Sequence, residues 1–439
     1  MRWSCGDCVS WHVIQAFRRP LPHLEWRFPA VSLVVGPLPP YRTARQVPSP
    51  TIIKQRDLDE LSERLEAAPI IGFDTEFVSE DTFHPELCLI QVVTPDEMAV
   101  IDPQEVDVLP FWRAVAAREK TTVFHAGREE LSFMLRAVGA IPQRSFDVQY
   151  AAGFCSNEFP ASYGSVVGKF LGKQPMKGEQ RTDWRRRPLT DAQINYALED
   201  VRYLLPLFDR LTEILNKRGR LMWLKDELAQ WQQSIVDSQD RKDWRRVSGI
   251  GTLNARNLAV VRELWLWRQD EARRLNQPPK RLLRDDLLVE IAKRKTDQPD
   301  QILAIRGLQR SDLRRKAEEL AACVRRGMEA PLERGERLTH REPPPQLNLL
   351  GQFLTPALTS ICRQAEVAAS MVGTATDVRE LIAFRYGFGG INPNETPTLL
   401  QGWRADLVGN LLDDLLGGKK SIRIADPKHE DPLAFDDVK

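Results

Sequence analysis

The 439-residue chain lacks a long apolar run, a regular cysteine framework and a strong net charge. No apolar segment reaches the roughly 18 residues that a transmembrane helix needs, so we expect a soluble protein with no membrane partner. The six cysteines are scattered along the chain, which argues against a disulfide framework and favours a reducing, cytoplasmic location. Cys5 and Cys8 form a CxxC pair, but no second pair lies nearby, so the pattern does not predict a zinc or redox site.

The net charge of +1 conceals an uneven distribution of charge. Residues 51–150 contain 9 Lys and Arg against 19 Asp and Glu, whereas residues 241–330 contain 22 against 13. The first segment concentrates carboxylates and the second concentrates cations. This separation suits a chain that holds metal ions at one place and binds a polyanion at another.

The chain is too long for one ordinary domain, and its patterns change along the sequence. The strand-like runs IIGFDTEF, LCLIQVVT, MAVID and TTVFHA alternate with helical spacing in residues 49–215, which predicts an α/β domain with a mixed sheet covered by helices. After about residue 210 the strand signals stop. The remaining predictions are a leader without order (1–48), a helical connector (216–252), a helical domain (253–330), a charged, proline-rich linker (331–346), a second helical domain (347–417) and a loose polar tail (418–439).

Two acids interrupt the apolar segment IIGFDTEF at residues 70–77, which is otherwise typical of a buried strand. Asp74 and Glu76 are two residues apart, so on a strand their side chains project from the same face. Two buried carboxylates repel each other and are costly to desolvate. A divalent cation would remove that cost. The alternative is that each acid pairs with a Lys or Arg.

A second acidic position follows the strand-like run that ends near His125. In the stretch VFHAGREEL, Gly127 is expected to form a turn, and Glu129 and Glu130 to lie in the first turn of a helix. Acids are common there because of the helix dipole, and this explanation suffices for Glu129. Glu130 stands immediately before Leu131, and one acid of the pair can be directed over the edge of the sheet, where ligands of α/β proteins bind.

The stretch PLTDAQINYALEDVRYLLP predicts a helix that begins with a capping box formed by Thr190 and Gln193. Tyr196 and Asp200 are four residues apart and therefore neighbours on one helical face. A phenol beside a carboxylate can orient a water molecule for attack while the carboxylate binds metal. A surface contact between the two side chains is the simpler alternative.

Together, the order and spacing of these motifs resemble the tyrosine-bearing branch of the DEDD superfamily of 3′–5′ exonucleases. The segments DTEF, LCLIQV, IDP, FHAG, RTDWRRRPLT and YALEDVRYLLP resemble ribonuclease D, and this resemblance covers about residues 52–415. It implies a ribonuclease H-like mixed sheet with flanking helices, followed by two all-α, HRDC-like domains. One position departs from the family, which usually has Asp where this chain has Glu130. The departure bears on activity rather than on fold, because metal sites are sensitive to displacements of about 1 Å.

The resemblance also implies a role for each acidic residue. Two divalent ions, Mg²⁺ or Mn²⁺, would be held by Asp74, Glu76, Glu130 and Asp200. Tyr196 would help to position the water that attacks the terminal phosphodiester, and a nucleoside 5′-monophosphate would leave. Asp147, in RSFDVQY, is expected to support the site, and His125 to be a packed or hydrogen-bonded neighbour of it.

Two other parts of the chain are candidates for contact with nucleic acid. The segment RTDWRRRPL contains Arg181, Arg185, Arg186 and Arg187. A solvated loop is the default interpretation of these arginines, but their position before the Tyr196 helix favours contact with phosphate. The segments NQPPKRLLRDDLLVEIAKRK and LAIRGL resemble an HRDC domain, a helical nucleic-acid-binding module, and ATDVRELIAFRYG and LLQGWRADLVGNLL resemble the second HRDC-like unit of ribonuclease D.

The sequence therefore predicts a monomeric, metal-dependent exoribonuclease that trims the 3′ ends of structured RNA such as tRNA precursors. Two alternatives remain open. A decayed nuclease site would leave a nucleic-acid-binding protein, although the other motif residues are all present. DNA is the alternative substrate, because helicase-associated relatives share both domain types and nothing in the sequence indicates recognition of a 2′-OH.

Overall fold

The computed structural model describes residues 51–117, 119–176, 178, 182–240, 244–331, 344–388 and 395–438. The predicted leader, most of the predicted linker, the Cys5 and Cys8 pair and Arg181 lie outside these residues.

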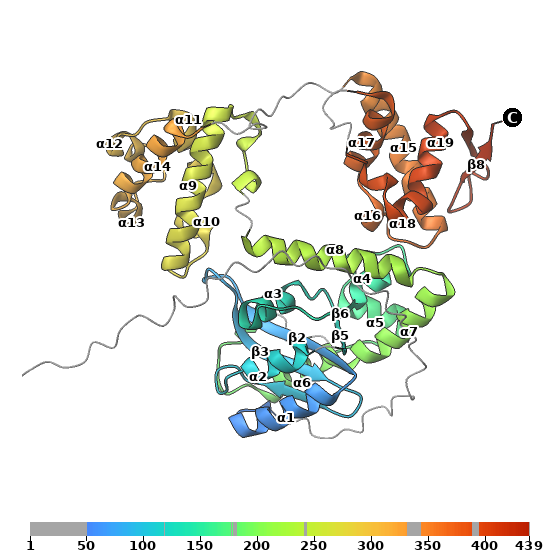
Figure 1. Cartoon of the computed structure of the whole chain (residues 1–439), viewed down its shortest axis with the longest axis horizontal. Coiled ribbons are helices and arrows are strands. Elements are labelled where there is room, and N and C mark those ends of the chain that lie inside the picture. Colours follow the sequence, from blue (N-terminus) through green and yellow to red (C-terminus); the bar gives the residue numbers. More distant parts are fainter. Residues whose placement is uncertain are drawn as a thin grey trace, which may run out of the picture. The chain divides into compact units, whose positions relative to one another are not determined.

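A six-stranded mixed sheet, in the order β1-β4-β3-β2-β5-β6, forms the centre of the first domain (Figure 1). Its strands are β1 (Thr51–Ile52), β2 (Ile70–Val78), β3 (Glu86–Val93), β4 (Met98–Ile101), β5 (Thr121–Phe124) and β6 (Arg144–Asp147). β2 pairs antiparallel with β3 and parallel with β5, so it lies inside the sheet rather than at an edge. The alternating strand and helix patterns thus correctly predicted β2 to β5, but they missed the short strands β1 and β6.

Helices pack on both faces of this sheet. They are α1 (Gln55–Ala67), α2 (Leu109–Ala116), α3 (Arg128–Val138), α4 (Val148–Gly153), α5 (Tyr163–Leu171), α6 (Asp191–Arg202), α7 (Leu204–Lys217) and α8 (Leu221–Asp240). On β2, Ile71 and Phe73 join the core formed with α1, α2 and α3. The alternate positions face α6 and α7, since a Cβ added to Gly72 would lie 3.2 Å from the Cβ of Leu204.

Two helix ends beside the sheet follow the local sequence. α3 ends at Gly139, whose left-handed backbone (φ 66°) lets its N–H donate to the carbonyl of Leu135 at 2.9 Å. α6 begins with the predicted capping box, in which Thr190 and Gln193 satisfy each other's backbone N–H groups.

The helical domain after the sheet has a core of its own. Its elements are η1 (Trp244–Arg246), η2 (Ile250–Thr252), α9 (Ala255–Arg274), α10 (Pro279–Leu282), α11 (Asp285–Arg294), α12 (Pro299–Leu303), α13 (Ser311–Arg314) and α14 (Ala317–Glu329). Leu264, Leu288 and Leu320 bring α9, α11 and α14 together and are fully buried. α14 approaches α9 closely at Gly327, where an added Cβ would lie 2.5 Å from the Cα of Val260.

The described residues of the last part of the chain are mainly helical up to residue 416 and then form a hairpin. Its helices are α15 (Pro345–Gln364), α16 (Ala369–Val372), α17 (Ala375–Tyr386), η3 (Thr398–Leu400), α18 (Gly402–Arg404), η4 (Ala405–Gly409) and α19 (Asn410–Leu416). None of the helices in the described ranges is both long enough and apolar enough to cross a membrane.

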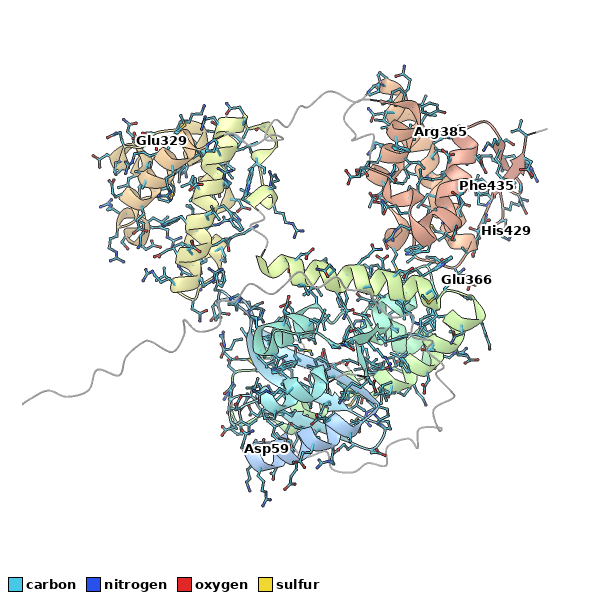
Figure 2. All side chains as sticks on the ribbon, viewed as in Figure 1. Asp59, Glu329, Glu366, Arg385, His429 and Phe435 are labelled. Carbon is cyan, nitrogen blue, oxygen red and sulfur yellow. The ribbon has the colours of Figure 1, made fainter. Side chains whose placement is uncertain are left out.

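The tail after residue 417 differs from the prediction that it is loose and that no strand follows residue 210. β7 (Lys420–Ile424) and β8 (Leu433–Asp437) form an antiparallel pair, and Phe435 of β8 is labelled in Figure 2. Ile422 lies opposite Phe435, and an ion pair of 2.7 Å joins Lys420 to Asp437. The tail was misjudged because its many charged residues pair with each other across the two strands.

Candidate active site

Two carboxylates project from the interior strand of the sheet. Asp74 and Glu76 lie on β2, half-buried, on the face that α6 covers. Asp74 lies opposite Gln91 of β3, and Glu76 lies opposite Leu89. The register shifts directly after Glu76, so a bulge ends the regular pairing immediately beyond the second acid. The strand therefore presents both acids together, as the DxE spacing predicts.

α6 brings a phenol and a third carboxylate to the same face. The hydroxyl of Tyr196 donates a hydrogen bond to Asp200, one helical turn further on. The ring of Tyr196 packs in a cluster with Leu89 of β3 and Trp184, whose ring centre lies 6.1 Å away. This packing holds the phenol in place, so the predicted Tyr196 and Asp200 pair is an anchored contact rather than a loose surface one.

Glu130 reaches the region from α3, on the opposite face of the sheet. Its side chain is 4% exposed, and its Oε1 accepts a hydrogen bond of 2.6 Å from the hydroxyl of Thr75. Thr75 stands between Asp74 and Glu76, so its side chain points away from theirs. Glu129, by contrast, is only partly buried.

Asp147 fixes the turn from which α3 begins. Its fully buried carboxylate accepts from the backbone N–H groups of Ala126 (3.2 Å) and Gly127 (3.1 Å), and from the N–H of Gln149 at 2.8 Å. Ala126 has a positive φ of 56°, a conformation that these bonds stabilise. The Nε2 of His125 lies 2.9 Å from the carbonyl of Ala161, in keeping with a packed, hydrogen-bonded neighbour.

The four acids affect one another electrostatically. Burial raises the pKa of Glu76 to about 8, and the charges of Asp200 and Glu130 contribute to the same shift. Burial also raises the pKa of Glu130 to about 7 and that of Asp200 to about 7. The pKa of Asp74 lies well above its usual range because of burial first and then of the charges of Glu130, Asp200 and Glu76. The acids therefore share one region in which negative charge is unfavourable.

The chemistry of this region suits a divalent cation. In the part of the chain that the structure describes, no Lys, Arg or His forms an ion pair with Asp74, Glu76, Glu130 or Asp200. Carboxylate oxygens are the ligands that Mg²⁺ and Mn²⁺ prefer. Within the described ranges, however, no three of the acids already converge closely enough to hold one ion, so their side chains would have to move closer together to bind it.

The arginine-rich segment is attached to the sheet by ion pairs. Arg187 binds the buried Asp102 with both ends of its guanidinium, at 2.5 and 2.6 Å. Arg185 bonds to Asp81 at 2.6 Å and to Glu86 at 2.8 Å. Arg186 is exposed and forms no ion pair with the described residues. Arg185 and Arg187 thus form ion pairs within the domain, whereas the charge of Arg186 is exposed to solvent.

Sequence reasoning missed several residues close to the acids. The hydroxyl of Tyr163 donates to the carbonyl of Glu199 (3.2 Å) and accepts from the N–H of Tyr203 (3.0 Å), which ties α5 to the end of α6. Burial raises the pKa of Tyr163, and the charges of Asp200 and Asp74 add to that shift. Nothing in the local pattern around Tyr163 indicates this position, because the contact joins two helices that are distant in sequence.

A family of 3′–5′ exonuclease domains matches residues 50–216, and the HRDC domain family matches residues 257–324. Ribonuclease D of Gluconacetobacter diazotrophicus is 33% identical over 371 residues, which cover 83% of this chain and 92% of that protein. Ribonuclease D of Escherichia coli is 30% identical over 372 residues, which cover 82% of this chain and 96% of that protein.

A solved structure matches as well. The crystal structure of Escherichia coli RNase D, described as an exoribonuclease involved in structured RNA processing, superposes with a TM-score of 0.72 at 28% identity. The match covers 84% of this chain and 99% of that one. The predicted fold class, a mixed sheet with flanking helices followed by a helical region with an HRDC domain, is thereby confirmed.

Proposed function

The chain belongs to the ribonuclease D family, and we propose that it is a 3′–5′ exoribonuclease that trims the 3′ ends of structured RNA such as tRNA precursors. The observation that carries the proposal is the gathering of Asp74, Glu76, Glu130 and Asp200 without a pairing cation in the described residues, beside an anchored Tyr196. Acids with raised pKa values and no pairing cation are typical of functional sites.

Each residue has a role in this proposal. Two divalent ions, Mg²⁺ or Mn²⁺, would be held by Asp74, Glu76, Glu130 and Asp200. When bound, such ions supply an activated water and stabilise the charge on the phosphate. Tyr196, which lies beside Asp200, would orient the water for attack in line with the terminal phosphodiester. The product is a nucleoside 5′-monophosphate.

The rest of the chain supports binding of the RNA. The excess of Lys and Arg in residues 241–330 lies partly in the HRDC domain, where residues 257–324 contain 15 Lys and Arg against 11 Asp and Glu, and it favours contact with the phosphate backbone. Arg186 extends this positive charge to the segment that precedes α6. We further propose a monomer located in the cytoplasm, in keeping with four described cysteines that are free and buried.

The test is degradation of a 3′-tailed structured RNA, and of a DNA with the matched sequence, by the purified full chain with EDTA, Mg²⁺ or Mn²⁺. We expect metal-dependent release of nucleoside 5′-monophosphates from the RNA tail. Asp74→Ala should abolish it, and Tyr196→Phe should reduce it strongly while leaving the fold intact. Release from DNA at the same or a higher rate would favour a DNA exonuclease. If no mononucleotide leaves either substrate, the enzyme proposal fails.

The Glu130→Asp variant tests whether Glu in place of the family's usual Asp weakens the nuclease activity of this chain. A steep rise in rate on substitution would identify an attenuated site. An unchanged or lower rate would show that Glu130 is an accepted ligand in this chain. The fold of each variant is checked by its thermal unfolding in EDTA.

A further inference from the structure

A single threonine connects the two faces of β2. Thr75 lies between Asp74 and Glu76, but its side chain projects toward α3 rather than toward α6. There its hydroxyl donates to Oε1 of Glu130 at 2.6 Å, and both side chains are buried, Thr75 to 5% exposed and Glu130 to 4%. The bond joins residues that are 55 positions apart in the sequence.

The hydrogen bond from Thr75 restricts the positions that the longer Glu130 side chain can adopt. Compared with Asp, Glu adds one methylene of about 1.5 Å and one rotatable bond, so its carboxylate can adopt more positions at the end of the same backbone. A short, charge-assisted hydrogen bond from a β-branched side chain on an interior strand restricts those positions. Thr75 lies on β2, the strand that also carries Asp74 and Glu76. The hydrogen bond therefore attaches Glu130 to the same strand as the other two acids.

The bond leaves Glu130 able to bind a cation. A carboxylate has about four lone-pair sites, and Thr75 occupies one of them. The second carboxylate oxygen of Glu130 has no hydrogen-bond partner from another side chain in the described residues.

We propose that Thr75 is the positioning residue that allows Glu130 to serve at this site in place of the family's usual Asp. The hydroxyl fixes one carboxylate oxygen and leaves the second oxygen to turn toward the cation that Asp74 also binds. The inference rests on the proposed function, because it requires that these acids bind a divalent ion. It predicts that Thr75 matters specifically when residue 130 is Glu.

The experiment measures Mn²⁺ binding to the full chain by calorimetry, together with kcat and KM on the 3′-tailed RNA. Thr75→Val keeps the shape of the side chain and removes the hydroxyl, whereas Thr75→Ser keeps the hydroxyl. Thr122→Val is the matched control, because Thr122 is also fully buried, lies opposite Ile71 on the same face of the sheet, and has a hydroxyl with no hydrogen-bond partner in the described residues.

We expect Thr75→Val to weaken Mn²⁺ binding about 10-fold, the lower end of the range for groups that orient metal ligands. kcat should fall while KM for RNA stays unchanged, since the RNA-binding surface is not altered. Thr75→Ser should retain binding within about twofold, and Thr122→Val should match the wild type.

The same substitution in a Glu130→Asp background tests the specificity of the contact. The shorter Asp cannot keep the 2.6 Å contact with Thr75 from the same backbone position. Thr75→Val should therefore change Mn²⁺ binding less than about twofold in that background, against the 10-fold loss with Glu130. An equal loss in both backgrounds would overturn the proposal, because it would show a general effect on β2 rather than an effect on Glu130.

The remaining outcomes are also decisive. If the wild type binds Mn²⁺ and degrades RNA but Thr75→Val binds as tightly as the wild type, the positioning role is refuted and the proposed function stands. If the wild type binds no Mn²⁺, the proposed metal site fails and the inference fails with it. Should Thr75→Val not fold in EDTA, Thr75→Ala is compared with Thr75→Ser, since both lack the γ-methyl and differ only in the hydroxyl.

Discussion

Arg187 and Arg186 are adjacent in sequence, and the structure predicts opposite consequences of losing each one. Arg187 places its guanidinium on the buried Asp102 through bonds of 2.5 and 2.6 Å, and it also donates to the carbonyls of Trp184 (2.7 Å) and Cys88 (2.8 Å). Arg186 is exposed. We therefore predict that Arg187→Met destabilises the sheet domain, whereas Arg186→Met affects binding of RNA and not stability.

The magnitude follows from what Arg187→Met leaves behind. Asp102 is 2% exposed and would keep only the N–H of Gln104, at 3.0 Å, to compensate its charge. Removing one partner of a buried ion pair costs about 3–5 kcal/mol. That is a large part of the roughly 5–15 kcal/mol by which a domain is stable. Arg186→Met should stay within about 0.5 kcal/mol of the wild type.

The assay is hydrogen exchange of the peptides that cover β3 and β4, because these strands report on the sheet domain alone in a chain of several domains. A loss of about 4 kcal/mol would speed their exchange by global unfolding about 1000-fold. Replacing both partners, as in Asp102→Leu with Arg187→Met, should restore much of the protection, since no unpaired charge remains. Equal protection in the Arg187→Met and Arg186→Met proteins would refute the reasoning.

Three other predictions follow from the site and the helical domain. Since burial raises the pKa of Glu76 to about 8 in the fold and an unfolded Glu ionises near about 4.3, the fold binds extra protons between these values. The melting temperature in EDTA should thus fall as pH rises from about 5 to 8, and excess Mg²⁺ should reduce the fall. If the melting temperature of Glu76→Gln fell with pH as steeply as that of the wild type, the prediction would be contradicted. Arg186→Met should lower the slope of log affinity for RNA against log salt by about 0.7–1, as measured by titration at several salt concentrations, and an unchanged slope would show that Arg186 contacts no phosphate. Gly327→Ala should destabilise the HRDC domain by about 1–3 kcal/mol in urea unfolding, because the added Cβ would meet α9. Gly251→Ala is the control and should not destabilise the domain, because the space around Gly251 is open. Equal stabilities of the two variants would mean that α14 can shift.

The parts of the fold that local patterns predicted are those with enough residues to show a period. β2 and β3 have nine and eight residues, and the capping box at Thr190 is a local motif. β1 has two residues, too few to show alternation, and β6 (RSFD) has a single apolar residue, whereas the equally short β4 (MAVI) and β5 (TTVF) are rich in apolar and β-branched residues. The hairpin of β7 and β8 was missed because its stability depends on pairing between two charged segments.

The candidate site shows the same division between local and long-range information. The spacing of Asp74 and Glu76 predicts a shared face because only the geometry of one strand is involved. The bond from Thr75 to Glu130 joins positions 55 residues apart, and the pair of Arg187 with Asp102 joins positions 85 residues apart. Charge patterns along a sequence do not reveal such partners. The sequence therefore did not reveal that two members of the arginine segment fasten it to the sheet, and its contact with phosphate stays a prediction.

The position of β2 within the sheet has a consequence for how the protein is made. The acids that surround it come from residues 74 to 200, which is most of the sheet domain. During synthesis, Asp74 and Glu76 leave the ribosome long before α6 is translated. A nascent chain therefore contains only some of the four acids of the site. The fourth acid arrives together with the helix that covers that face of the sheet. Nuclease activity is therefore expected only after the domain is complete, and the ribosomal RNA beside the emerging chain is not exposed to an active site before then.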